Sequence, residues 1–233
     1  MLSELIQEMQ KLANPEQARN LQRFFKTGKG EYGEGDVFLG IKVPVQREMV
    51  KKYSGIGFPK IQELLNSKVH EHRLVALLIL VDKFKKANEE GKGDIFNFYL
   101  KNAKNINNWD LVDLSAPNIV GGFLCDKKKD IIYKLAESGN LWEKRIAVLS
   151  TFMFIKNGEF ADSLRISEML LKDSHDLIHK AVGWMLREIG KKDEKILEDF
   201  LRKHYKEMPR TMLRYAIEKF PEEKRKSYLK GEV

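Results

Sequence analysis

The sequence has little cysteine and no long apolar run, and each shortage argues against a class of protein. Cys125 is the only cysteine, so an internal disulfide is impossible and a thiolate zinc site is disfavoured. No run of about 18 apolar residues occurs, as a membrane-spanning helix would need. Charges interrupt the hydrophobic residues of segment 1–12, unlike the core of a signal peptide. We therefore expect a soluble, cytoplasmic protein with no membrane association.

Prolines are also few, six in all, and no convincing alternating strand pattern occurs. Most of the prolines precede an apolar pattern with a period near 3.6, as a proline in the first turn of a helix does. The fold class expected is all-α. The expected helices span residues 3–11, 15–25, 44–53, 59–65, 71–86, 95–101, 107–123, 129–138 and 141–156, with five more towards the C-terminus.

What the sequence does contain is charge. Of its 233 residues, 42% are hydrophobic and 33% charged, enough apolar material for one extended core or two small ones. Lysine and arginine exceed the acidic residues and give a formal net charge of +8. A cationic surface of this kind favours a polyanionic partner such as a nucleic acid.

A loose internal repeat supports a helical-repeat architecture. A basic residue leads an apolar run containing a small residue at Arg73, Arg145, Lys180 and, less clearly, Arg214, with a spacing of about 35 residues or twice that. Helix-pair repeats of this length stack into solenoids, because no single pair buries its own apolar face. The second helices would then line a concave basic groove.

One pair of residues in this chain suggests chemistry. Trp109 and Asp113 stand at i and i+4, so an aromatic face and a carboxylate project from the same side of a helix and could meet a cationic reaction centre. By pattern alone, a helical tryptophan is more often a core residue, and Asp113 could equally face solvent. Asp110 lies about 100° away around the helix and is interpreted as a first-turn or surface acid.

The other motifs give less information about function. The glycine-rich segment 28–35 lacks the lysine and hydroxyl residue of a phosphate loop, so we reject nucleotide hydrolysis. His175 and His179 have a metal-binding spacing, but no third ligand is evident, and no metal or other cofactor is expected. No lysine beside Asp113 marks a Schiff-base nucleophile, so covalent catalysis by an amine is not expected.

Several motifs together resemble the DNA alkylation repair proteins of the alkylpurine DNA glycosylase D family. They are the run from Phe24 to Asp36, the run Phe38 to Pro44 with Arg47, the run Asn108 to Asp113, Arg145 in its helix, and the run Lys180 to Glu188. The motifs follow the family's order and cover residues 12–220. The resemblance implies a HEAT-like repeat fold, which we expect to form one domain over residues 1–233. It also implies excision of cationic N3- and N7-alkylated purines from double-stranded DNA.

The resemblance also implies roles for particular residues. Trp109, Asp113 and Trp184 would form the active surface, and Arg145 would hold a nearby phosphate. Lys42 and Arg47 flank Pro44 at a helix start, where the backbone N–H groups already favour an anion. Arg187 follows Trp184 by three residues and could reach the DNA backbone, although a position at the core edge is nearly as well supported. Lys180, which leads a repeat, completes the predicted DNA contacts.

Two hypotheses remain at this point. The first is a monofunctional glycosylase that acts through Asp113 with the two tryptophans. The second is a non-catalytic helical-repeat module that binds DNA or an acidic protein partner through the same basic surface. A binding module would need the cationic residues but not Asp113, whose charge opposes DNA. We expect a monomer in either case, because a solenoid that clasps DNA needs no partner subunit.

Overall fold

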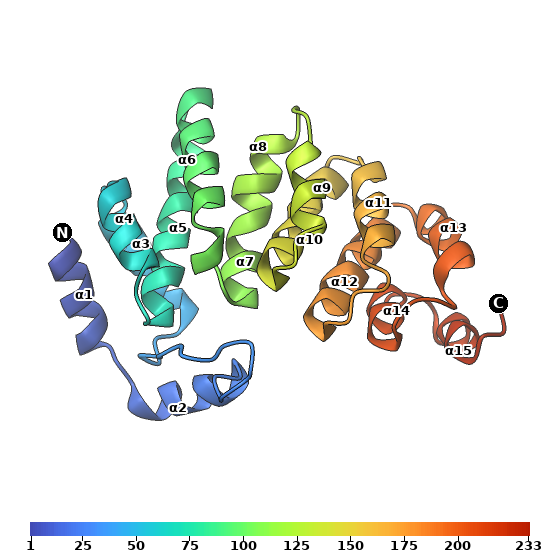
Figure 1. Cartoon of the computed structure of the whole chain (residues 1–233), viewed down its shortest axis with the longest axis horizontal. Helices are drawn as coiled ribbons and strands as arrows, with labels where there is room; N and C mark the ends of the chain where they lie inside the picture. Colours follow the sequence, from blue (N-terminus) through green and yellow to red (C-terminus); the bar gives the residue numbers. More distant parts are fainter. The chain divides into compact units, whose positions relative to one another are not determined.

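The computed structural model describes all 233 residues, and their regular secondary structure is almost entirely helical. One isolated parallel bridge joins Val37 and Val69. The all-α prediction is therefore confirmed. The chain divides into two compact units, residues 1–115 and 116–233 (Figure 1). That residues 1–233 form a single HEAT-like repeat domain, as the family resemblance implied, stays a prediction.

In the first unit, α5 is the central helix. The unit's helices are α1 (Leu2–Lys11), α2 (Pro15–Phe24), α3 (Val43–Tyr53), α4 (Phe58–Leu65), α5 (His70–Lys86), α6 (Glu89–Lys101), the short η1 (Ala103–Asn105) and α7 (Trp109–Ala116). α3, α4 and α6 pack against α5. Every residue of α5 from His70 to Val81 is buried. By contrast, no residue of α2 is fully buried, so that helix covers the unit only loosely.

The irregular segment 25–42 between α2 and α3 is held to α5 by one carboxylate. Glu71 is 1% exposed, and its two carboxylate oxygens accept hydrogen bonds from the backbone N–H groups of residues 39–41, at 3.0, 2.8 and 3.2 Å. Gly40 sits among them with φ of +84°, and a Cβ there would lie 2.2 Å from the carbonyl oxygen of Asn14. Only glycine fits such a backbone position.

In the second unit, α10 and α12 are the long helices. Its elements are the π-helical turn η2 (Pro117–Gly121), α8 (Gly122–Leu124), α9 (Asp130–Ala136), α10 (Leu141–Lys156), α11 (Ala161–Met169), α12 (Asp176–Lys192), α13 (Glu194–His204), α14 (Arg210–Ala216) and α15 (Glu222–Lys230). α12 packs against α10 and α14, and α10 also packs against α9, α11 and η2. The apolar residues of α12 are buried on one side, and its polar residues lie on the other.

Gly183 allows α12 and α14 to approach closely, which gives a testable prediction. A Cβ at this position would lie 2.5 Å from the carbonyl oxygen of Met212 and 2.5 Å from the Cβ of Tyr215. Gly183→Ala should therefore lower the free energy of unfolding by about 1–3 kcal/mol through overpacking. Gly139→Ala is the matched control, since nothing lies within 4 Å of its added Cβ. Urea denaturation of both variants makes the comparison, and equal stabilities would contradict the close approach.

Most of the predicted helices are confirmed with small shifts at their ends, including all five after residue 156. Two predictions needed correction. α6 begins at Glu89, six residues before the predicted start at 95, because Asn88 caps it by accepting from the N–H of Gly91 at 3.0 Å. The predicted helix 107–123 is not uniformly α-helical, since Pro117 has no N–H to donate and a π-helical turn begins there. None of the helices is both long enough and apolar enough to span a bilayer.

Candidate active site

Trp109 and Asp113 lie on the same partly exposed side of α7. Both side chains are of intermediate exposure, whereas Asp110, Leu111 and Val112 between them are buried. Residues at i and i+4 of a helix have Cβ atoms about 5–6 Å apart. The indole and the carboxylate are therefore neighbours, as the sequence predicted.

The indole of Trp109 packs against two phenylalanines from the end of α2. The Phe25 ring stacks on it at 5.1 Å between centroids with 17° between the planes, and the Phe24 ring meets it edge-on at 5.8 Å. Phe24 is itself 63% exposed. Trp109 is thus fixed by ring contacts on one side and accessible on another, so it is not a simple core residue.

A buried hydroxyl pair, Tyr99 from α6 and Ser115 from the last turn of α7, lies near Asp113. The Tyr99 hydroxyl, which is fully buried, lies 2.8 Å from Ser115 Oγ, which in turn donates to the carbonyl oxygen of Leu111. Burial raises the pKa of Tyr99 well above its usual range, and the negative charge of Asp113 adds to this. The Tyr99 phenol therefore stays neutral. It lies close enough to Asp113 for the charge of that residue to affect its pKa.

Beneath α7 lies a buried chain of charged groups that the sequence had not suggested. His70 Nε2 is 2.8 Å from Asp110 Oδ2, and His70 Nδ1 is 3.2 Å from Asp36 Oδ2. Arg73 completes the chain with an ion pair of 2.6 Å to Asp36 Oδ1. Each of the four residues is no more than 7% exposed. Asp110 is a first-turn acid of α7, as one of the two sequence interpretations had it, but it is not a surface acid, because α5 and the segment 25–42 cover that side of the helix.

The charges of this network hold His70 protonated. Burial by itself would lower the pKa of His70, but the charge and hydrogen bond of Asp110, with the hydrogen bond to Asp36, raise it to about 9. Burial also opposes the charged form of Asp36, yet the hydrogen bond to His70 and the charge of Arg73 outweigh it and lower the pKa of that carboxyl. At neutral pH the imidazolium donates an N–H to each of two carboxylates.

The raised pKa predicts how stability depends on pH. A histidine whose pKa rises from 6.5 to about 9 on folding stabilises the protein fully below pH 6.5, and that contribution is lost as the pH rises to about 9. We expect the free energy of unfolding to fall by up to about 3 kcal/mol across this window, at about 1.4 kcal/mol per pKa unit. Urea denaturation at a series of pH values measures it. The His70→Gln variant should lack this component, and an equal decline in that variant would contradict the assignment.

A mainly apolar cavity of about 330 Å³ adjoins the network within the first unit. It is lined by Phe25, Phe38 and Leu74 as well as by His70 and Asp110. Gln17, Leu21 and Phe24 of the loosely packed α2 form another wall. The side of α7 that carries Asp110 therefore borders open space as well as the charged network.

In the second unit, Lys180, Trp184 and Arg187 lie on one side of α12, as their spacing predicted. The Trp184 indole is partly exposed and donates its Nε1–H to Glu188 Oε1 at 3.0 Å. The Phe152 ring lies 6.1 Å away. The indole is therefore partly accessible, while its N–H is held by a carboxylate.

The predicted cationic contacts differ in how accessible they are. Lys180 is 40% exposed and pairs with Asp176 at 2.7 Å. Arg187 is 17% exposed, and its guanidinium pairs with Glu218 and more loosely with Glu188. Arg145 is only 5% exposed and donates to the carbonyl oxygen of Leu177 at 2.5 Å. A phosphate contact by Arg145 or Arg187 stays a prediction and would have to involve these existing partners.

Lys42 and Arg47 are both exposed at the start of α3, where the sequence placed them.

Arg73, the first of the residues that lead a repeat, is buried instead of exposed. Arg73 is 4% exposed, with its guanidinium bound to Asp36 and to the carbonyl oxygen of Ser67 at 2.7 Å. It therefore does not contribute to a basic surface, and the prediction that every repeat-leading cation lies in one groove is wrong for this residue.

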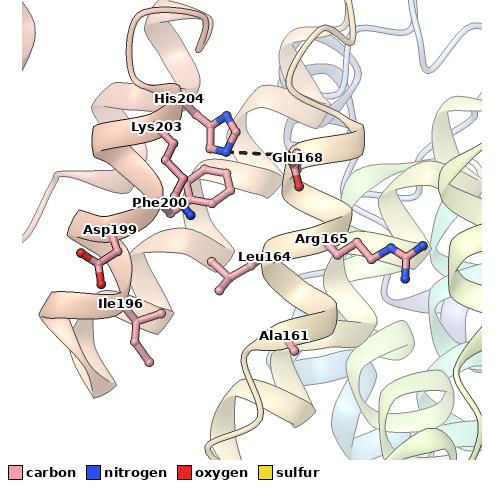
Figure 2. A pocket seen from close by; sticks show the side chains of 9 residues that line it. All are labelled: Ala161, Leu164, Arg165, Glu168, Ile196, Asp199, Phe200, Lys203 and His204. Atoms are coloured by element: carbon pink, nitrogen blue, oxygen red, sulfur yellow. Dashed lines mark ion pairs between the residues drawn. The ribbon is translucent and has the colours of Figure 1, made fainter.

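A second cavity, of about 480 Å³, contains none of the predicted site residues. It lies between α11 and α13, and His204 Nε2 faces Glu168 Oε1 across it at 3.8 Å (Figure 2). Leu164 and Phe200 form an apolar floor, and the charges around it are of both signs. Mixed charges of this kind match neither a polyanion nor a cationic base, so this cavity is not a candidate for binding either.

Two residues of importance, His70 and Glu71, were missed by sequence reasoning, and the burial of Asp110 was not foreseen. One signal was available, since four consecutive polar residues, His70 to Arg73, begin a helix that is otherwise strongly apolar. Polar side chains in such a position are buried and must be hydrogen-bonded to partners elsewhere in the chain.

The two histidines at the start of α12 have local roles. His175 Nδ1 accepts a hydrogen bond from the N–H of Leu177, and His179 Nε2 lies 2.5 Å from the carbonyl oxygen of Asp173.

Comparison with known proteins identifies relatives of the chain. Residues 5–220 match the protein family described as DNA alkylation repair enzyme. A search of curated proteins found no match.

Three solved structures have a similar fold. A predicted DNA alkylation repair enzyme from Enterococcus faecalis is 16% identical with a TM-score of 0.69, covering 90% of this chain and 97% of its own. AlkD2 from Streptococcus mutans is 18% identical with a TM-score of 0.56, covering 88% of this chain and 97% of its own. The smu.31 protein of Streptococcus mutans UA159 is 18% identical with a TM-score of 0.54, covering 91% and 98%. At these identities the likeness establishes the fold alone.

Proposed function

The chain belongs to the DNA alkylation repair enzyme family, and from that premise we propose that it is a monofunctional DNA glycosylase. Its substrates are cationic N3- and N7-alkylated purines in duplex DNA, and it hydrolyses the N-glycosidic bond. The observation that carries the proposal is the partly exposed pair of Trp109 and Asp113 on α7, above a helix side that is otherwise buried.

The chemistry requires a carboxylate more than a strong acid. Alkylation at N3 or N7 gives the purine a positive charge and makes it a good leaving group, so the bond breaks with oxocarbenium character on the sugar. As the bond stretches, positive charge leaves the base and gathers at C1′. An ionised Asp113 beside C1′ stabilises the second distribution more than the first, and only that difference accelerates the reaction. The same carboxylate can orient the water that captures the sugar cation.

The tryptophans select the charge of the lesion. An indole face attracts a cation by roughly 0.5–2 kcal/mol, depending on desolvation. Trp109 and Trp184 would each offer such a face to the alkylated nucleotide, and neutral bases would gain less. The excision of cationic lesions ahead of neutral ones follows from this. Neither indole supplies a proton, because a cationic purine needs none.

The cationic residues would bind the DNA backbone. The net charge of +8 supports a polyanionic partner, and Lys42, Arg47, Arg145, Lys180 and Arg187 are the proposed phosphate contacts. Lys42 and Arg47 are the exposed members at a helix N-terminus, where the helix dipole adds to their charge. Phosphate contacts fix the register of the protein on the duplex, and the chemistry at α7 depends on that register.

The salt dependence of binding tests these contacts. Each phosphate neutralised contributes about −0.9 to the slope of log K against log salt concentration. Replacing Lys42 and Arg47 together with glutamine should reduce the magnitude of the slope by about 2. Lys51→Gln, at the far end of α3, is the matched control and should leave the slope unchanged. Fluorescence anisotropy with an unmodified duplex measures it, and an unaltered slope in the double variant would remove both residues from the interface.

The activity is tested by product analysis. Duplex DNA methylated to contain 7-methylguanine and 3-methyladenine is incubated with the protein, and the released bases are quantified by mass spectrometry against a protein-free sample, since these bases also leave spontaneously. A second duplex with bulky N7 adducts defines the lesion range. Release above the protein-free rate supports the glycosylase. Binding to DNA with no release above that rate would favour the non-catalytic module instead.

A further inference from the structure

We propose that His70 is a positioning residue that holds Trp109 and Asp113 in their working orientation, acting through Asp110 and through the Phe25 ring. The kinetic part of this inference rests on the proposed function, whereas its spectroscopic part does not. His70 does not contact the substrate in the proposed mechanism. It contacts the buried side of α7, through Asp110.

The first connection runs through the backbone of α7. Asp110 lies in the first turn of this eight-residue helix, and its carboxylate is bound to His70 on the long helix α5. Because Asp110 projects from a different side of the helix than Trp109, the bond fixes the rotation of α7 about its own axis. A rotation of about 20° would move a side-chain end that lies about 5–6 Å from the axis by about 2 Å. A misplacement of about 1 Å can cost a hundredfold in rate.

The second connection runs through aromatic rings. The His70 ring stacks on Phe38 at 4.6 Å with 21° between the planes, and it lies 5.0 Å from Phe25. Phe25 in turn stacks on Phe38 at 5.1 Å and on Trp109 at 5.1 Å. The imidazolium is thus the charged end of a group of rings that reaches the partly exposed indole. Moving His70 would move the surface against which Trp109 rests.

Close packing alone does not hold α7 in its orientation, because a cavity lies beside it. The cavity of about 330 Å³ borders both His70 and Asp110, and α2 covers it without a fully buried residue of its own. An interior without voids holds its helices by shape, but here part of the supporting wall is absent. The hydrogen bonds of His70 therefore carry more of the orientation of α7 than a buried pair in a filled core would.

A protonated histidine is specifically required at this position. Its two ring nitrogens face Asp36 from the segment 25–42 and Asp110 from α7, so both must carry a proton for both bonds to form. On its own helix the facing charge is Arg73, which is paired with Asp36. Two more charged groups line the cavity, Lys42 and Glu71, and the carboxylate of Glu71 is occupied by backbone N–H groups. Loss of the proton leaves one carboxylate without its donor.

The direct test follows Trp109 fluorescence against pH in a chain carrying Trp142→Phe and Trp184→Phe, which leaves one indole. We expect the emission to change with a midpoint near the His70 pKa of about 9. The change should disappear when His70→Gln is added, and its midpoint should fall when Asp110→Asn is added. A flat response near pH 9, or the same response in the His70→Gln chain, would overturn the inference whether or not the protein is a glycosylase.

The kinetic test compares single-turnover release of 7-methylguanine with DNA affinity. His70→Gln should lower the rate tenfold to a hundredfold while leaving the Kd for duplex DNA within about threefold, because no phosphate contact is altered. The control is His72→Gln on the same helix, where His72 Nδ1 faces Ser67 Oγ at 2.9 Å and not α7. It should keep the wild-type rate. Equal losses in the two variants, or parallel losses of rate and affinity in His70→Gln, would indicate general destabilisation and contradict a positioning role.

Discussion

Asp113→Asn should slow the release of 7-methylguanine at least thirtyfold under single-turnover conditions. Asparagine keeps the size and shape of the side chain but removes the charge that the proposed mechanism places beside C1′. Two unit charges about 4 Å apart interact by roughly 4 kcal/mol at an effective dielectric of 20. If half of that is gained only in the transition state, the loss is about thirtyfold in rate. Removing the water-orienting carboxylate adds to it.

The same substitution should not weaken DNA binding. The carboxylate repels the phosphate backbone, so Asp113→Asn should bind duplex DNA as tightly as the wild type or more tightly. Asp94→Asn, which changes an exposed acid on α6, controls for the change in net charge. Equal rates for wild type and Asp113→Asn would show that the acid is not part of the reaction. A rate that falls only because binding is lost would also contradict the assignment.

Arg73→Met should cost about 3–5 kcal/mol of folding stability, the largest structural effect expected. Arg73 and Asp36 form a buried ion pair at 2.6 Å, with side chains 5% and 4% exposed. Removing one member of a buried pair leaves the other charge in a poorly solvated place, and that uncompensated charge is the main source of the loss. Here the remaining carboxylate also binds His70, so the substitution disturbs the support of α7.

An exposed pair provides the comparison. Lys51 and Glu48 lie 2.8 Å apart with side chains 72% and 70% exposed, so Lys51→Met should change the stability by less than about 1 kcal/mol. Urea denaturation at pH 6, followed by far-UV circular dichroism, measures both variants. Similar small effects for the two substitutions would mean that the Arg73 ion pair contributes no more than a surface contact.

The helices were predictable because their signals are local. Apolar residues recur with a period of 3.6, and prolines and capping residues mark where helices begin. The same local geometry placed Trp109 and Asp113 on one side of α7. The start of α6 was missed because its first six residues contain Gly91 and Gly93 and no large apolar residue. Its N-terminus is fixed by a cap.

The support beneath the site was not predictable in this way. His70 is 34 residues from Asp36 and 40 from Asp110 along the sequence, and no periodic pattern links positions so far apart. The angle around the helix correctly turned Asp110 away from Trp109, but it could not show that α5 covers that other side. Arg73 and Arg145 share one local pattern, and the pattern did not reveal that Arg73 is bound to Asp36.

The phenylalanines show a further gap between motif and mechanism. Phe24, Phe25 and Phe38 were recognised as parts of a family resemblance, but nothing in their spacing indicated that two of them stack on Trp109 or His70. Those ring contacts depend on how segment 25–42 folds back onto α5, which in turn depends on Glu71. The motif therefore has a structural role at this site that its residue types alone do not reveal.

The central claim is that the protein breaks the glycosidic bond of a cationic purine, and one measurement tests it most directly. Wild-type protein is mixed in excess with methylated duplex DNA, and free 7-methylguanine is followed over time beside a protein-free sample and the Asp113→Asn variant. The account predicts fast release by the wild type and release at least thirtyfold slower by the variant. Release by the wild type at the protein-free rate, with DNA binding intact, would contradict it.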